Sequence, residues 1–116
     1  MVVEDDALVA LDLETLLLMA GCEVVGPMAR VDQALSAAVS MEFDGALLDI
    51  HLRGALVYPV ADVLASRRIP FMFLSGYSCH DLPERFGGRP ISTKPYIARM
   101  LLVKLAEVLD GSGTRQ

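Results

Sequence analysis

Along this chain, short apolar runs alternate with longer stretches in which apolar residues recur every three or four positions. The first pattern is typical of buried β-strands and the second of amphipathic helices. Predicted strands cover residues 1–3, 23–26, 46–48, 71–74 and 90–93. Predicted helices cover residues 7–20, 31–41, 58–67 and 97–109. Any helix between residues 77 and 89 is expected to be short, because Pro83, Gly87 and Gly88 interrupt it.

This alternation of strand and helix predicts an α/β fold. Strands that are apolar along their whole length are typical of a parallel sheet buried on both faces. At 116 residues the chain has room for one domain. We therefore expect a doubly wound, five-stranded parallel sheet with helices on both faces in residues 1–110, followed by a polar C-terminal tail at residues 111–116.

The predicted strands end in polar residues that can carry chemistry. Glu4 and Asp5 follow the first strand, Asp49 the third, Ser75 the fourth and Lys94 the fifth. The site of a doubly wound sheet lies at the carboxyl ends of its strands. These five residues, contributed by four strands, are therefore expected to converge on one edge of the sheet.

Their chemistry favours phosphoryl transfer. Carboxylates brought together repel one another unless a cation balances their charge. An all-oxygen set with few protein ligands suits Mg²⁺, which also binds phosphate oxygens. A carboxylate can act as a nucleophile and form an acyl phosphate, and a lysine and a hydroxyl can stabilise the transferred group. We expect phosphorylation of Asp49 beside Mg²⁺ held by Glu4, Asp5 and Asp49.

Four motifs, in this order and spacing, resemble those of the response-regulator receiver domain of two-component signalling. They are Val2–Asp6, Leu47–Ile50, Ser75-Gly76 and Lys94-Pro95, and the resemblance covers nearly the whole chain. It implies a flavodoxin-like sheet with strand order 2-1-3-4-5 and a cis Lys94-Pro95 bond. It also implies roles for individual residues: Glu4, Asp5, Asp49 and the backbone carbonyl of His51 as Mg²⁺ ligands, Asp49 as phosphoacceptor, Ser75 as switch hydroxyl and Lys94 as the invariant lysine.

Within this family, the segments Tyr58–Asp62, Ile69–Phe71 and Phe73–Tyr77 resemble a single-domain group found in alphaproteobacteria. The resemblance implies a single-domain response regulator that accepts a phosphoryl group from a histidine kinase or histidine phosphotransfer protein and signals through protein–protein interaction. Such a switch assists its own phosphorylation and dephosphorylation and is not an enzyme acting on an outside substrate. The alternative is a pseudo-receiver, which binds partners without being phosphorylated. A metal-dependent phosphatase would need a second acid to protonate a leaving group, and none is evident near Asp49.

Three features depart from the usual receiver pattern. The first strand is shorter than in most receivers. Arg53 stands where many receivers carry proline after the phosphorylation loop. Ile91 occupies the place where many carry an aromatic rotamer switch, so the usual coupling of hydroxyl to ring is expected to be absent or changed.

Composition and charge narrow the choice of partners. The ten basic residues are scattered in a chain of formal charge −5, so we expect no nucleic-acid partner. The longest apolar run is about five residues, far short of the roughly twenty that a membrane-spanning helix requires. Cys22 and Cys79 show no pairing pattern, which suits a reducing compartment. We expect a cytoplasmic protein without a membrane partner.

Two predicted helices carry more apolar residues than one sheet face can cover. The runs are Leu16–Met19 in the first helix and Met100–Val103 in the last. They wrap too far around each helix for a simple amphipathic pattern. We expect an exposed apolar patch there, for docking of a kinase or phosphotransfer helix pair or for homodimerisation.

Overall fold

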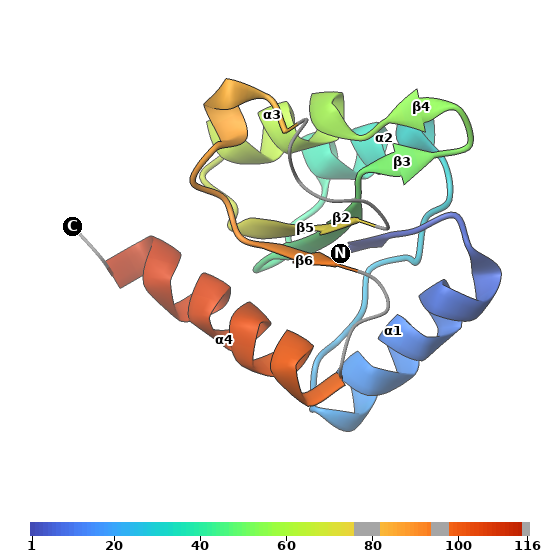
Figure 1. Ribbon diagram of the computed structural model, residues 1–116, viewed down its shortest axis with the longest axis vertical. Coiled ribbons are helices and arrows are strands. Elements are labelled where there is room, and N and C mark those ends of the chain that lie inside the picture. The colour runs from blue at the N-terminus through green and yellow to red at the C-terminus, as the bar shows by residue number, and fades with distance from the viewer. Residues whose placement is uncertain (76–81, 94–97, 115–116) are drawn as a thin grey trace.

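The computed structural model describes residues 1–75, 82–93 and 98–114 and has three layers (Figure 1). Its helices are α1 (Ala7–Met19), α2 (Val31–Ser40), α3 (Tyr58–Ser66), the 3-10 turn η2 (Glu84–Phe86) and α4 (Ala98–Thr114). Its strands are β1 (Val2–Val3), β2 (Ala46–Asp49), β3 (His51–Leu52), β4 (Ala55–Leu56), β5 (Phe71–Ser75) and β6 (Ile91–Thr93). Helices α2 and α3 cover one face of the main sheet, and α1 and α4 cover the other.

The main sheet is parallel and has the order β1-β2-β5-β6. Its register aligns Val3, Leu48 and Phe73 in one row across three strands. These three side chains belong to the core under α2 and α3, whereas the neighbouring row of Val2, Leu47 and Met72 packs under α1 and α4. Successive strand residues point to opposite faces, so both faces of the strands are buried. The predicted α/β class with a parallel sheet flanked by helices is confirmed.

The predicted second strand at residues 23–26 requires a correction. This segment runs beside β1 without forming a regular strand, and only Met28 pairs, in an isolated parallel bridge with Val3. Val2 N donates to Val25 O at 2.9 Å and Met28 N donates to Val2 O at 2.9 Å. Gly26, at a φ of +100°, and Pro27, which has no N–H, interrupt an extended ladder here. The structure thus shows four of the five expected strands in the expected order, with this segment at the edge next to β1.

Local signals account for where the helices begin. The Asp6 carboxylate caps α1 by accepting hydrogen bonds from Leu8 N at 3.0 Å and Val9 N at 3.2 Å. Pro59 lies in the first turn of α3. Backbone N–H groups of the first turn have no acceptor within the helix, so the missing N–H of proline costs no hydrogen bond there.

Helix α4 continues to Thr114, past its predicted end at Leu109. Residues 111–114 are therefore helical, although a polar tail was expected from residue 111 onwards. The glycines in this segment did not end the helix, because glycine weakens a helix without always terminating it.

A small antiparallel hairpin follows β2 where a loop was expected. Its strands β3 and β4 pair His51 with Leu56 and Leu52 with Ala55. Leu52 is buried in the core under α2 and α3, which ties the hairpin to the rest of the domain. The hairpin brings backbone N–H groups close to the carboxyl end of β2.

Some sequence expectations lie outside the described residues. These are the positions of Cys79 and Lys94 and the cis Lys94-Pro95 bond. Within the described residues, Cys22 is a free cysteine. Among the helices that the structure describes, none combines the length and hydrophobicity needed to cross a bilayer.

Candidate metal centre

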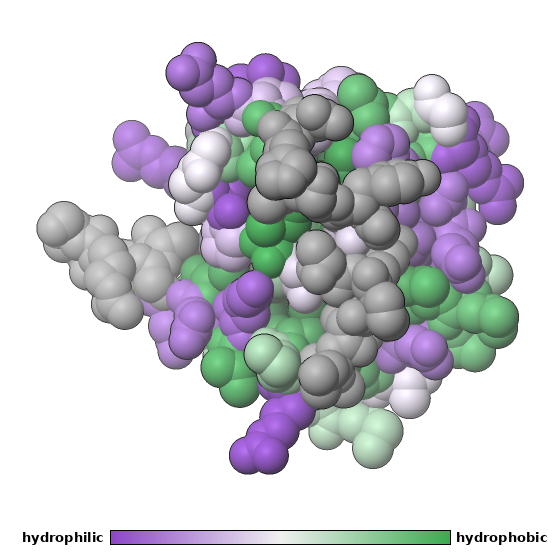
Figure 2. Space-filling model, in the orientation of Figure 1, coloured by the Kyte–Doolittle hydropathy of each residue, from purple (hydrophilic) through white to green (hydrophobic). Residues whose placement is uncertain are grey.

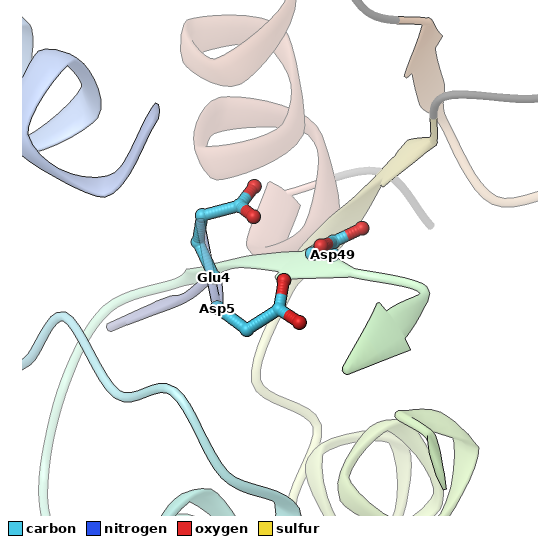
Figure 3. A group of neighbouring side chains, drawn as sticks. All are labelled: Glu4, Asp5 and Asp49. Carbon is cyan, nitrogen blue, oxygen red and sulfur yellow. The ribbon is translucent and has the colours of Figure 1, made fainter. Parts of the chain in front are cut away.

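Three acidic side chains meet at the carboxyl end of the main sheet (Figure 3). Glu4 and Asp5 come from the segment between β1 and α1, and Asp49 is the last residue of β2. One carboxylate oxygen from each residue lies within 4.8 Å of the other two. The sequence prediction that these acids converge on one edge is confirmed.

Strand pairing explains why Glu4 reaches Asp49. Val3 is level with Leu48 in the parallel ladder between β1 and β2, so the next residue on each strand continues at the same height. The backbone N–H of Asp6 donates to Glu4 Oε2 at 3.0 Å, which orients this carboxylate as the chain turns into α1. The position of Glu4 is therefore set by the sheet on one side and by the start of the helix on the other.

The β3–β4 hairpin holds the other two acids. The backbone N–H of His51 donates to Asp49 Oδ1 at 3.4 Å, a long hydrogen bond. The backbone N–H of Arg53 donates to Asp5 Oδ2 at 2.9 Å. A bond from Val57 N to Ile50 O at 3.0 Å extends the pairing of the hairpin to the residue that follows β2. Each acid of the cluster thus accepts a hydrogen bond from a backbone amide near it in space.

Burial strengthens the electrostatic repulsion among the three carboxylates. Glu4 and Asp49 are only 2% and 4% exposed, and Asp5 is half-buried. Negative charges held this close in a poorly solvated place repel one another, which favours binding of a cation. The cluster therefore has the charge and the exposed side, at Asp5, that an ion needs in order to enter and stay.

The donor set fits Mg²⁺. This ion prefers oxygen ligands at about 2.0–2.1 Å in octahedral geometry, which places neighbouring ligand oxygens about 3 Å apart and opposite ones about 4 Å apart. The carboxylate oxygens of Glu4, Asp5 and Asp49, within 4.8 Å of one another, lie in the neighbourhood of these separations. A site with three protein carboxylates also leaves positions for water or for phosphate oxygens.

Of the other predicted site residues, Ser75 lies within the described part of the chain and Lys94 does not. Ser75 is the last residue of β5 and is buried, and the residue before it, Leu74, pairs with Asp49 across the ladder. The hydroxyl residue and the acid therefore end adjacent strands. Strand β6 ends at Thr93, which pairs with Ser75 in the parallel ladder. The next residue, Lys94, follows the described part of this strand. A ligand role for the His51 carbonyl stays a prediction.

Sequence reasoning missed the amide of Arg53 as a partner of this site. The contact joins a main-chain group to a carboxylate 48 positions away, and residue type says little about such contacts. A local signal was nevertheless present, because the Arg53-Gly54 pair marks a turn. Both residues have positive φ, +43° at Arg53 and +84° at Gly54.

No family model matches the chain, but curated and solved relatives do. It is 31% identical over 86 residues to the transcriptional regulatory protein PdtaR of Mycobacterium tuberculosis. The matched segment is 73% of this chain and 42% of PdtaR, so the chain spans less than half the length of this curated relative.

Solved structures resemble the chain over nearly its whole length. The solution structure of SdrG from Sphingomonas melonis Fr1 has a TM-score of 0.82 and 38% identity, and covers 93% of this chain and 92% of SdrG. A BeF3-activated SdrG from Pseudomonas melonis Fr1 has a TM-score of 0.78 at the same identity and coverage. The PhyR response regulator REC domain of Erythrobacter litoralis has a TM-score of 0.82 and 25% identity, and covers 99% of this chain and 93% of that domain.

Proposed function

The chain belongs to the receiver domains of response regulators, and on this premise we propose that it accepts a phosphoryl group on Asp49 in a Mg²⁺-dependent reaction. The observation that carries the proposal is the acidic cluster at the carboxyl end of β2, where Asp49 lies buried beside Glu4 and Asp5. The BeF3-activated state of SdrG supports it, because BeF3 on a carboxylate mimics a phosphoryl group.

Asp49 is the best placed of the three acids to be the nucleophile. It ends β2, which pairs with β1 on one side and with β5 on the other. It therefore lies between the acids Glu4 and Asp5 and the hydroxyl residue Ser75. An acceptor in this position has metal ligands on one flank and a hydrogen-bond donor on the other, as phosphoryl transfer requires.

The proposed reaction is an in-line transfer from a phosphohistidine. An Asp49 carboxylate oxygen attacks phosphorus, a new O–P bond forms, the N–P bond to the donor imidazole breaks, and its electron pair stays on the imidazole nitrogen. Mg²⁺ held by Glu4, Asp5 and Asp49 would balance charge on the transferring oxygens. Ser75 donates a hydrogen bond to one phosphoryl oxygen and Lys94 pairs with another. The proposed consequence is a shift of Ser75 that changes the surface offered to a protein partner.

The donor is proposed to dock on α1. The side chains of Leu8, Leu11 and Leu18 are 75%, 58% and 54% exposed, and their spacing puts them on one stripe of the helix. In Figure 2 hydrophobic surface gathers over α1. The helix begins next to Glu4 and Asp5, so a helical donor lying along the stripe brings its phosphohistidine towards Asp49. Met100 and Val103, exposed on α4, extend the apolar surface on the same face of the sheet.

The central test is the intact mass of the protein after incubation with acetyl phosphate and Mg²⁺. We expect one phosphoryl group on the wild type, and none on Asp49→Asn or without Mg²⁺. The matched control is Asp44→Asn, which makes the same change at an exposed residue just before β2, at its other end, and is expected to be phosphorylated normally. A folded wild type that binds Mg²⁺ and gains no mass would contradict the proposal and favour the pseudo-receiver.

The docking surface is tested by comparing two donors. We expect Leu11→Glu plus Leu18→Glu to slow transfer from a phosphorylated kinase or phosphotransfer protein by at least about tenfold. Labelling by acetyl phosphate should not change, because this small donor needs no docking. Val39→Glu, on α2 at the opposite face and 62% exposed, is the control. If the double variant instead turns a wild-type dimer into a monomer and leaves transfer intact, the stripe is a homodimer interface.

A further inference from the structure

We propose that Arg53 is a positioning residue for Mg²⁺ binding, and that its backbone N–H, held in a left-handed conformation, orients the carboxylate of Asp5. The inference rests on the proposed function, since it concerns the same metal centre. It also gives the β3–β4 hairpin a role in the metal centre, in addition to the role of the three acids.

The contact is short and directional. Arg53 N donates to Asp5 Oδ2 at 2.9 Å, within the ordinary range for an N–H···O bond to a carboxylate. A carboxylate has two oxygens, so Oδ2 can accept this bond while Oδ1 is available to a cation. Asp5 is the most exposed of the three acids, and a half-buried side chain has more rotamers to lose when an ion binds. A bond that orients it beforehand reduces this cost.

The backbone at Arg53 adopts a conformation that residues with a Cβ seldom use. Its φ of +43° lies in the left-handed region, which is unfavourable for an L-residue other than glycine because its Cβ comes too close to the following carbonyl oxygen. The surrounding hairpin keeps it there, because His51 pairs with Leu56, Leu52 with Ala55, and Val57 N bonds Ile50 O. The turn therefore directs the N–H of residue 53 out of the hairpin towards Asp5. Proline, which many receivers carry at this position, has no N–H to donate and a φ fixed near −65°.

The same hairpin contacts a second acid. His51 N donates to Asp49 Oδ1, so backbone groups two residues apart on one hairpin hold two of the three proposed ligands. Partners that orient metal ligands in this way commonly change metal affinity by about 10- to 100-fold when they are lost. The hairpin thus acts as a frame that sets the spacing of Asp5 and Asp49 before the ion arrives.

The test is a Mg²⁺ titration followed by ¹H–¹⁵N NMR on wild type and three variants. We expect Arg53→Pro to raise the Mg²⁺ dissociation constant about tenfold or more, because the substitution removes the N–H that orients Asp5. Arg53→Gly keeps the N–H and accepts positive φ, and it should restore affinity to within about twofold of the wild type. Arg68→Pro is the matched control, because Arg68 also has positive φ (+61°) and also donates its N–H, to Ala65 O at 3.1 Å. It should lose stability and keep Mg²⁺ affinity.

A second measurement covers the case in which Arg53→Pro does not fold. Hydrogen exchange of the Arg53 amide should speed up at least about tenfold in Asp5→Ala, which removes the acceptor while leaving the hairpin in place. Equal exchange rates in wild type and Asp5→Ala overturn the inference, as does a folded Arg53→Pro that binds Mg²⁺ like the wild type. A wild type that binds no Mg²⁺ overturns the proposed function together with this inference. A wild type that binds it, with no contrast between proline and glycine at position 53, overturns the inference alone.

Discussion

The guanidinium of Arg67, just after α3, donates a hydrogen bond to the carbonyl oxygen of Ala38 in the last turn of α2, at 2.6 Å. The same Nη1 donates to Met41 O at 2.9 Å, and Nη2 contacts Glu42 Oε2 at 3.1 Å. The carbonyls at the end of a helix have no partner within the helix, and a cation there also suits the helix dipole. Arg67 therefore closes α2 from the neighbouring helix.

Removing this group is expected to destabilise the domain. Arg67→Met keeps much of the aliphatic packing and loses the bonds to Ala38 and Met41. Since the side chain is only 25% exposed, we expect a loss of about 1–3 kcal/mol in the free energy of unfolding, measured by urea denaturation. Arg68→Met, at the exposed neighbouring position, is the control and should change stability by less than about 0.5 kcal/mol. Equal effects of the two substitutions would show that Arg67 does not cap α2.

Gly26 is expected to tolerate no side chain. A Cβ there would lie 2.7 Å from the backbone oxygen of Val2 and 3.0 Å from Met28 N, and the φ of Gly26 is +100°. Because Val2 O accepts the bond from Met28 N, the clash falls on the pairing that holds this segment to β1. We expect Gly26→Ala to cost about 2–4 kcal/mol of stability, by thermal or urea unfolding.

Gly88→Ala is the control for this substitution. A Cβ at Gly88 meets nothing within 4 Å, so the change should be close to neutral. If Gly26→Ala were as stable as Gly88→Ala, the segment that includes Gly26 and Met28 would not be held against β1 as described.

Neutralising Asp49 is expected to stabilise the metal-free protein, although most substitutions at buried positions destabilise. Asp49→Asn removes one of three clustered negative charges and keeps the side-chain shape. We expect a gain of about 1 kcal/mol in EDTA, measured as a higher Tm, because the repulsion falls. The wild type should gain stability as Mg²⁺ is added, by about 2.7 kcal/mol at a hundred times the dissociation constant, and the variant much less. A variant that is less stable than the wild type in EDTA contradicts this account of the cluster.

A pH effect is expected at the start of α2. The hydrogen bond from the Arg30 side chain holds the pKa of the Asp32 carboxyl below its ordinary value of 3.8. A carboxyl whose pKa is lowered on folding contributes stability that is present above the unfolded pKa and is lost as pH falls through the folded pKa. The effect is therefore confined to acid pH, below about 4 to 5.

The measurement is an NMR titration of the Asp32 carboxyl. Arg30→Gln should raise the pKa of Asp32 towards 3.8, whereas Arg99→Gln, on α4 at the other face of the sheet, should leave it lowered. An Asp32 pKa that does not respond to Arg30→Gln would mean that the Arg30–Asp32 ion pair, 64% and 65% exposed, does not persist in solution.

The convergence of Glu4, Asp5 and Asp49 could be predicted from the sequence because a simple rule of sheet geometry sufficed. Apolar runs identify the strands, and parallel strands direct their carboxyl ends to one edge. The residues that follow the strands are therefore neighbours whatever the details of packing. Helix starts could be predicted for a similar reason, since Asp6 and Pro59 act on the backbone within a few residues.

Only the tertiary structure decided the features that depend on backbone contacts between distant residues. The segment before Met28 has an apolar pattern suitable for a strand, yet Gly26 and Pro27 reduce its pairing with β1 to a single bridge. The bond from Arg53 N to Asp5 depends on a positive φ that the β3–β4 pairing maintains, and the capping of α2 by Arg67 depends on how α3 packs beside it. Main-chain groups are chemically alike at nearly every position, so residue type does not reveal their partners. Those partners exist only once the fold has brought the segments together.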